Sequence, residues 1–333
     1  MPVSPQLLSS IAQFTQASSV SRTHVIQTLW GGYGTLFRAY LNDAEVLSVV
    51  VKYIALPQPK KHPKGWNTVT SHQRKLDSYQ VEVNWYQYFA NNSHNECFVP
   101  HCVYVERLDD AILLILDDLS PAGYSEVVTS ARQAHIESCL SWLAFFHAQH
   151  LHTNCSSSAI YNGLWPSGTY WHLATRPDEL DALEDLRLKN AADLIDQTLN
   201  DAQYQTLVHG DAKLANFCFT PEGTKAAAVD FQYVGQGCGM KDVILLLSSV
   251  LDFSKATDQA PVYLDYYFAQ LSTALATLQP QLNAHSVEQE WRNLYPIAWA
   301  DFQRFVKGWS PDHWKINDYT EALTVQALEQ LGA

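Results

Sequence analysis

The spacing of hydrophobic positions changes along the chain from the period of strands to the period of helices, and the change falls near residue 120. Before it, short β-branched or alternating stretches are typical of strands. The predicted strands cover 25–29, 36–41, 46–53, 97–106 and 111–116. Two helices accompany them, a short amphipathic one within 1–21 and a longer one over 71–90. A glycine-rich turn joins the first two strands, so we expect an antiparallel sheet.

Beyond residue 130 the apolar positions follow the helical period, with brief strand-like interruptions. The predicted helices cover 131–150, 178–199, 241–251, 261–278, 287–307 and 318–331. We therefore predict an α+β protein of two lobes. Residues 1–119 form an N-lobe with a small antiparallel sheet, and residues 120–333 form a larger, mainly helical C-lobe. The irregular stretch 116–121 links them.

Residues 55–70 interrupt the pattern with three Pro, one Gly, several Lys and a His. This composition predicts an exposed, mobile insertion. Its role stays open.

Composition narrows the class of protein. With 333 residues, 47% of them hydrophobic, the chain can bury a substantial core. A net charge of −13 argues against a general nucleic-acid binder but leaves a nucleotide substrate possible. None of the six Cys forms a Cys-x-x-Cys pair, which favours free thiols in a reducing compartment. No secretory signal or membrane-length apolar run is apparent, so we expect a soluble, cytoplasmic protein.

The most informative motif is the run His-Gly-Asp-Ala-Lys-Leu-Ala-Asn at 209–216, followed by Val-Asp-Phe at 229–231. An Asp followed by an Asn five positions on, with a second Asp in the next strand-like segment, has the spacing of a kinase catalytic loop and its metal-binding Asp. A lone His-x-Asp recurs by chance, whereas this fuller pattern is much more specific. It predicts phosphoryl transfer from ATP.

Each residue type suits one part of that chemistry. Asp211 is the predicted general base, which orients the acceptor hydroxyl and takes its proton late. Lys213 stabilises the transferring phosphoryl group. His209 completes the catalytic set by holding the loop through hydrogen bonds to backbone. Asn216 and Asp230 offer the oxygen ligands that Mg²⁺ prefers.

Other residues are expected to bind the nucleotide. Gly31, Gly32 and Gly34 would cover the phosphates, although alone they are more simply a hairpin turn. Lys52, at the end of an apolar strand, would pair with the α- and β-phosphates, although alone it is a solvated charge. Glu82 in the following helix would orient that lysine, although alone it is a surface residue.

Two further acids have open assignments. Asp118 follows an apolar strand, where a hinge would meet the adenine through backbone groups; a turn-forming acid is an equally good interpretation. Asp242 opens an apolar helix, which favours an N-cap, with a brace for the catalytic loop as the alternative.

The motifs at 209–216 and 229–232 resemble those of the aminoglycoside phosphotransferase and choline kinase superfamily, a branch of the protein-kinase-like fold. The ecdysteroid-kinase-like group is more similar still. Its hinge is similar to Leu-Asp-Asp-Leu-Ser at 116–120 with Gly-Tyr at 123–124, and its ion-pair helix to Glu-Val-Asn-Trp-Tyr at 82–86. The helix before the catalytic segment is similar to Ala-Phe-Phe-His-Ala at 144–148. The resemblance runs from about residue 31 to about residue 247 in the expected order. It implies a bilobal kinase-like fold that uses ATP and Mg²⁺.

The chain departs from the patterns of aminoglycoside kinases and protein kinases at informative places. Ala212 stands where aminoglycoside kinases usually have Leu, and Gln232 replaces the Gly that often follows Asp-Phe. No long activation segment ending in Ala-Pro-Glu is present, which favours a small hydroxylated substrate over a protein. Four Trp (291, 299, 309, 314) with Asp301, Arg304, His313 and Tyr319 form either a helical core or the acceptor pocket.

The sequence hypothesis is thus an ATP- and Mg²⁺-dependent kinase of a small hydroxylated molecule. The alternative is a nucleotide-binding pseudokinase that serves as a scaffold, but such proteins typically lose the Lys, the base or the metal Asp. A dinucleotide-binding dehydrogenase is excluded by layout, because the glycines lie between two strands and no helix follows them.

Overall fold

A computed structural model describes residues 3–55, 69–108, 110–153 and 161–333. The chain divides into two compact units. Unit 1 comprises Met1–Asn92 and Val99–Ser125, and unit 2 comprises Ser93–Phe98 and Glu126–Ala333. Residues 56–68, most of the predicted insertion, lie outside the described residues.

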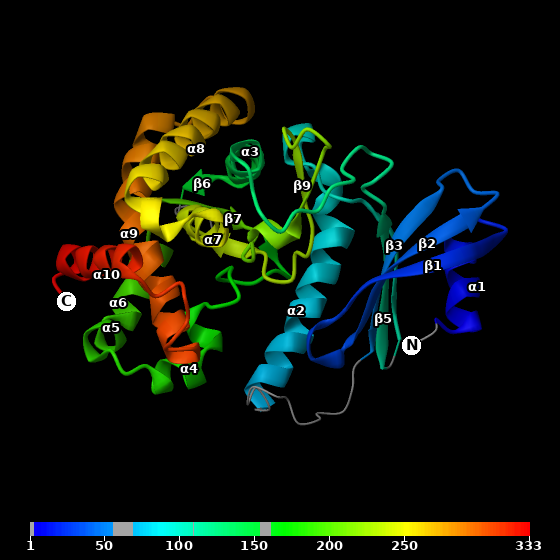
Figure 1. Cartoon of the computed structure of the whole chain (residues 1–333), viewed down its shortest axis with the longest axis horizontal. Helices are drawn as coiled ribbons and strands as arrows, with labels where there is room; N and C mark the ends of the chain where they lie inside the picture. The colour runs from blue at the N-terminus through cyan, green and yellow to red at the C-terminus, as the bar shows by residue number, and fades with distance from the viewer. Residues whose placement is uncertain (1–2, 56–68, 109, 154–160) are drawn as a thin grey trace. The chain divides into compact units, whose positions relative to one another are not determined.

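Unit 1 is built on a five-stranded antiparallel sheet with the order β1-β2-β3-β5-β4 (Figure 1). The strands are β1 Ser19–Thr28, β2 Gly34–Asn42, β3 Ser48–Ala55, β4 Cys102–Arg107 and β5 Ala111–Asp117. Helix α1, Pro5–Phe14, buries Ile11 against one group of strand residues that includes Phe37 and Val51. Helix α2, Val69–Tyr88, buries Tyr79 and Val83 against another group. Side chains alternate between the two faces of a sheet, and here the apolar side chains of both faces are packed against a helix.

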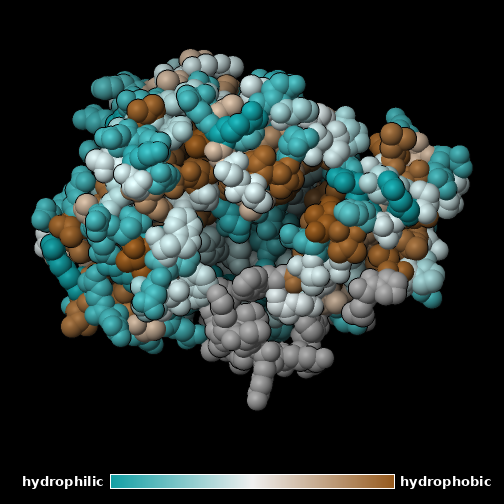
Figure 2. Space-filling view, viewed as in Figure 1, coloured by the Kyte–Doolittle hydropathy of each residue, from teal (hydrophilic) through white to brown (hydrophobic). Residues whose placement is uncertain are grey.

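The edge strand β1 begins earlier than the sequence predicts. Nearly all its side chains are exposed, and its first half carries no alternation of apolar and polar residues that would predict a strand. Strand β4 is shorter than predicted, since a 3₁₀ turn at Asn95–Cys97 and Pro100 precede it. Figure 2 shows apolar residues on the surface of unit 1. The large exposed ones on β1 and the β2–β3 turn are Val25, Ile26, Val46 and Leu47.

Unit 2 is mainly helical. Its helices are α3 Gln133–His150, α4 Pro177–Ala182, α5 Leu186–Asn190, α6 Ala192–Asn200, α7 Met240–Val250, α8 Ala256–Leu278, α9 Ala284–Trp309 and α10 Asp318–Leu331. In Figure 1, α9 runs past α4, α6, α7 and α10, and it packs against each of them. The single helix predicted over 178–199 is three helices. The chain turns after α4, and the Asp185 side chain caps α5 by accepting from Leu188 N.

Short strands in unit 2 hold the segments that contain the predicted catalytic motifs. Strand β7, Tyr204–Val208, pairs with β6, His152–Thr153, and with β10, Gly235–Gly237. A hairpin of β8, Phe217–Phe219, and β9, Ala226–Ala228, follows. The predicted motifs lie at the ends of these strands, held by backbone ladders rather than on long loops. Among the described residues, no helix is long and apolar enough to cross a membrane, and the five described cysteines form no disulfide.

Candidate active site

The predicted catalytic loop, residues 209–216, starts where β7 ends, at Val208, and closes in a 3₁₀ turn over Leu214–Asn216. Gly210 has φ of 76°, and a Cβ there would lie 2.0 Å from the carbonyl oxygen of Tyr233. Only glycine fits this close approach of two backbones. Glycine at position 210 is thus a geometric requirement of the turn that presents Asp211.

His209 positions this loop. Its ring is fully buried; Nε2 donates to the carbonyl of Val229 at 3.0 Å, and Nδ1 accepts from the Asp211 backbone at 3.2 Å. The ring also packs on Phe231, with centroids 4.5 Å apart. Both nitrogens are used by backbone, so the side chain ties the loop to the segment that carries Asp230.

Asp242 braces the same loop from α7. One carboxylate oxygen accepts from His209 N at 2.5 Å and the other from Gly210 N at 2.9 Å. The N-cap of α7 is Gly239, so the N-cap interpretation of Asp242 is wrong and the brace is observed. His147 Nε2 approaches the carboxylate at 3.2 Å, and its Nδ1 lies 2.8 Å from the Tyr267 hydroxyl.

No role was predicted for His147. A histidine inside an apolar helix is usually a core residue. The available signal was its place in the Ala-Phe-Phe-His-Ala run at 144–148. Its burial in α3 beside Asp242 makes it part of the support for the loop.

Asp211 has two unlike oxygens. Oδ2 accepts from Lys213 Nζ at 2.8 Å and from Asn216 Nδ2 at 3.0 Å. Oδ1 is buried and has no hydrogen-bond partner among the described residues. Burial alone would lower the pKa of Lys213, but Asp211, with Asp230 and Tyr233, outweighs it and raises the pKa above its ordinary value. One oxygen is fixed by a cation and an amide, and the other is left for a proton donor.

Asn216 and Asp230 offer oxygen donors of the kind that a hard cation prefers. The Asn216 amide nitrogen donates to both the backbone oxygen and Oδ2 of Asp211, at 2.8 and 3.0 Å, so its carbonyl oxygen points away from them. Asp230 has φ of 69°, an uncommon backbone for a non-glycine residue, and Gln232 Nε2 donates to its Oδ1 at 2.5 Å. An amide oxygen and a carboxylate are the donors Mg²⁺ takes, and they fit it.

In unit 1, Lys52 and Glu82 come together. Lys52 Nζ donates to both carboxylate oxygens of Glu82, at 2.7 and 2.6 Å, and both side chains are buried. Strand β3 and helix α2 thus hold a bidentate buried ion pair. Removing either partner would leave an uncompensated buried charge.

The family model for the ecdysteroid kinase-like family matches residues 35–164 and 167–280. The chain belongs to the ecdysteroid kinase-like family. The family resemblance predicted from sequence is confirmed, and with it the α+β, protein-kinase-like bilobal fold. No curated protein sequence matches the chain.

Two solved structures show the same fold for this ecdysteroid kinase-like protein. One is a Ralstonia eutropha JMP134 protein described as an aminoglycoside phosphotransferase, with 12% identity, a TM-score of 0.52, and coverage of 98% of this chain and 94% of that one. The other is the ethanolamine kinase of Plasmodium vivax, with 12% identity, a TM-score of 0.50, and coverage of 92% and 82%. At such identities the likeness is one of fold.

The predicted phosphate-covering glycines form the β1–β2 turn of this ecdysteroid kinase-like protein. Gly31, Gly32 and Gly34 have φ of 71°, 78° and 140°. A Cβ on Gly34 would lie 2.0 Å from the carbonyl oxygen of Tyr53 in the neighbouring strand, whereas a Cβ on Gly32 would meet nothing within 4 Å. The backbone shape is therefore glycine-dependent; nucleotide contact stays a prediction.

Gly34→Ala should lower the free energy of unfolding of unit 1 by about 1–3 kcal/mol, because β2 and β3 must separate to admit the methyl group. Gly32→Ala is the matched control: it keeps the backbone strain of positive φ without the clash and should cost about 1 kcal/mol. Urea denaturation of both variants measures the two losses and checks that the loss for Gly34→Ala is the larger. Equal losses would show that close packing against Tyr53 is not what selects glycine at Gly34.

Asp118 uses its carboxylate inside unit 1. Arg38 Nε donates to it at 2.5 Å and Ser48 Oγ at 2.6 Å, and the backbone of Ser120 adds a bond at 3.1 Å. Burial alone would raise the pKa of Asp118, but these hydrogen bonds outweigh it and hold the pKa below its ordinary value. The side chain fixes the segment after β5 to the sheet, and the predicted nucleotide contact rests on backbone groups.

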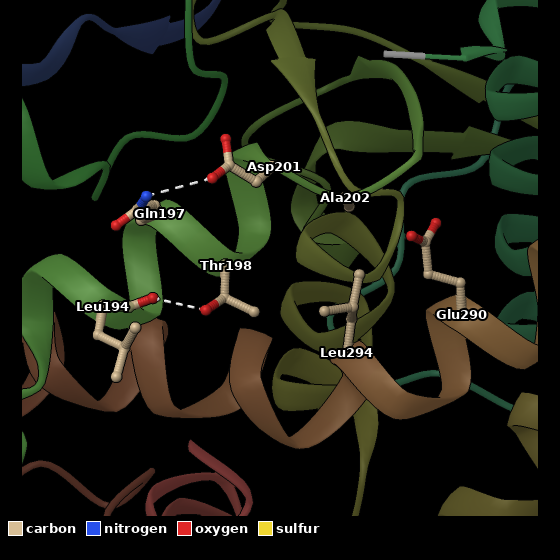
Figure 3. A pocket seen from close by; sticks show the side chains of 7 residues that line it. All are labelled: Leu194, Gln197, Thr198, Asp201, Ala202, Glu290 and Leu294. Carbon is tan, nitrogen blue, oxygen red and sulfur yellow. Dashed lines mark hydrogen bonds between the residues drawn. The ribbon is translucent and has the colours of Figure 1, made fainter. Parts of the chain in front are cut away.

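A pocket of about 460 Å³ on unit 2 lies away from these residues (Figure 3). Its lining comes from α6, the residues that follow it, and α9, and comprises Leu194, Gln197, Thr198, Asp201, Ala202, Glu290 and Leu294. The Glu290 carboxylate already accepts from the backbone N–H groups of Gln203 and Tyr204, at 2.7 and 2.9 Å. None of the catalytic-loop residues is among those that line it.

The proposed aromatic acceptor pocket divides into core and surface. Trp291 and Trp299 are fully buried, as are Asp301 and Arg304, whose side chains pair at 2.7 Å. These residues are core, the simpler of the two interpretations. Trp314 is 60% exposed and packs beside His313, Phe253 and Lys315.

Proposed function

We propose that this ecdysteroid kinase-like protein is an ATP- and Mg²⁺-dependent phosphotransferase that moves the γ-phosphate to a hydroxyl of a small molecule. The observation that carries the proposal is the state of Asp211: one carboxylate oxygen is fixed by Lys213 and Asn216, and the other is buried without a partner among the described residues. The family and the fold support it.

In the proposed reaction the acceptor hydroxyl donates a hydrogen bond to Asp211 Oδ1. This fixes the attacking oxygen, and the proton passes to the carboxylate as the new P–O bond forms and the bond to ADP breaks. The ammonium of Lys213 stabilises the charge on the transferring phosphoryl group. His209 and Asp242 hold the loop so that Asp211 does not move during the reaction.

Unit 1 supplies the phosphate contacts in this proposal. Lys52, oriented by Glu82, pairs with the α- and β-phosphates, and the Gly31–Gly34 turn covers them. Asn216 and Asp230 of unit 2 hold the cation. Mg²⁺, when bound, neutralises phosphate charge and orients the γ-phosphate for in-line attack.

ADP release over a broad panel of hydroxylated metabolites, with Mg·ATP and with excess EDTA, tests the proposal. Turnover of at least one acceptor that disappears in EDTA is the expected result. ATP binding without ADP release on any acceptor would contradict the proposal and favour the pseudokinase alternative. Absence of ATP binding would contradict both.

A further inference from the structure

The last turn of α7 joins the catalytic loop to a lysine outside the predicted site. Ser249 Oγ accepts a hydrogen bond from the backbone of Leu214, beside Lys213, at 3.0 Å. Its neighbour Ser248 accepts from Lys315 Nζ at 2.9 Å. Two adjacent residues of one helix thus place the Lys315 ammonium and the catalytic loop in the same neighbourhood.

The backbone of Lys315 is fixed between α9 and α10. Its carbonyl accepts from Gln303 Nε2 at 3.1 Å and from Thr320 Oγ1 at 2.9 Å, and its N–H donates to His313 Nδ1 at 3.2 Å. The ammonium lies 5.3 Å from the ring centroid of Phe302. The backbone of Lys315 is therefore fixed, and the Ser248 hydroxyl and the Phe302 ring contact its ammonium, which lowers the entropy cost of using the side chain.

The charge on Lys315 is poorly compensated. Of its three N–H groups, one has an acceptor within the described part of the chain, the neutral hydroxyl of Ser248, whose own proton goes to Leu245 at 2.7 Å. Lys307 on α9 shows the contrast, because it is held by Asp185 and Glu321, at 2.9 and 2.8 Å. A half-buried ammonium without a carboxylate partner is costly for folding.

The pKa of Lys315 agrees with its burial and its lack of a carboxylate partner in the described ranges. Burial lowers the pKa of Lys315 to about 8, against the opposing effect of Asp211 and with a further lowering by Lys213. Lys315 therefore feels the charges of both catalytic-loop residues. At neutral pH it is mainly protonated, so the ammonium groups of Lys213 and Lys315 both act electrostatically on the Asp211 carboxylate.

We propose that Lys315 is a specificity-determining residue of the acceptor site and that it recognises an oxyanion, such as a carboxylate, sulfate or phosphate group, on the hydroxylated acceptor. The inference rests on the proposed function. Two of its N–H groups have no acceptor among the described residues, and the ammonium is held on the helix that also contacts the catalytic loop, so they provide donors for such a group. Acceptors that carry an ammonium group are disfavoured by repulsion from Lys213 and Lys315.

Direct anion binding tests the site without turnover. Inorganic sulfate is titrated into the protein saturated with Mg·ADP and followed by equilibrium dialysis. Lys315→Met should weaken sulfate binding at least tenfold, Lys315→Arg should retain it, and Lys225→Met, which removes an exposed lysine of unit 2, should leave it unchanged. Equal sulfate affinity in the wild type and Lys315→Met would overturn the proposal.

Turnover supplies the second arm. Acceptors that differ only in carrying a carboxylate, phosphate, sulfate, amide or amine are compared by ADP release, which also identifies the preferred oxyanion. The wild type should favour an anionic member by more than tenfold in kcat/KM, mainly through KM, and Lys315→Glu should reverse the preference. A preferred cationic acceptor whose KM is unchanged in Lys315→Met would overturn the proposal. If no acceptor releases ADP, the proposed function fails and the sulfate arm alone decides the role of Lys315.

Stability and pH separate recognition from a structural role. A lysine whose pKa is below its unfolded value costs stability while protonated, and this cost is relieved as the pH rises above about 8. Lys315→Met should therefore not lower Tm at neutral pH, whereas a structural lysine would. Sulfate affinity should fall as the pH rises above about 8 and Lys315 loses its proton. The other titratable groups near Lys315 are Asp211, Lys213 and His313. A lower Tm with unchanged sulfate affinity would contradict the assignment.

Discussion

Replacing Asp211 by Asn is expected to lower kcat for phosphoryl transfer roughly 10³-fold, within the range that loss of a general base produces. An amide of the same shape can stand beside Lys213 and Asn216 but cannot take the proton of an acceptor hydroxyl. It also removes the negative charge that raises the pKa of Lys213. The loop geometry should survive, because His209 and Asp242 bond to backbone groups that the substitution does not change.

Affinity for Mg·ATP should change far less than kcat, because Lys52 and the glycine turn are the proposed phosphate contacts. Single-turnover ADP release and ATP titration, measured on the same preparation, separate the two quantities. Asp201→Asn is the matched control, since Asp201 is exposed in unit 2 and lies outside the catalytic loop. If Asp211→Asn retains turnover within tenfold of the wild type, Asp211 is not the base.

The sequence was sufficient to predict those elements whose structure depends on residues close together in the chain. The strands 36–41 and 46–53 alternate or are β-branched, and the helix at 71–90 has a continuous helical period, so each is present within a few residues of its prediction. The motif at 209–216 is also local, and a required glycine inside it fixes the turn. The pairing of Lys52 with Glu82 could be expected only through the family pattern, since 30 residues separate them.

The missed features depend on contacts that no short window contains. The break of 178–199 into three helices follows from capping by Asp185 and from packing on α9, because the apolar spacing alone continues through it. His147 contacts Asp242, which braces the catalytic loop, and Lys315 contacts Ser248, the neighbour of the loop-binding Ser249. Both are tertiary contacts with α7. Their residue types are uninformative in sequence, where a buried His and a loop Lys are both ordinary.

The brace at Asp242 makes the catalytic loop a structural element as well as a chemical one. Asp242→Ala should lower the free energy of unfolding by about 3–5 kcal/mol, since removing one member of a buried charged network strands its partners. The stranded groups are the backbone N–H of His209, the backbone N–H of Gly210 and the ring of His147. Urea denaturation measures the loss.

The activity of Asp242→Ala should fall by more than its loss of folded protein accounts for. Under conditions where Asp242→Ala stays folded, kcat should still drop, because the turn that presents Asp211 has lost both of its side-chain acceptors in α7. Asp265→Ala is the control: its carboxylate is 72% exposed and pairs with Arg292 at the surface, so its loss should cost at most about 1 kcal/mol. A folded Asp242→Ala with wild-type kcat would show that the backbone of 208–211 keeps its shape unaided. The positioning of Asp211 would then be assigned to Gly210 and His209 instead.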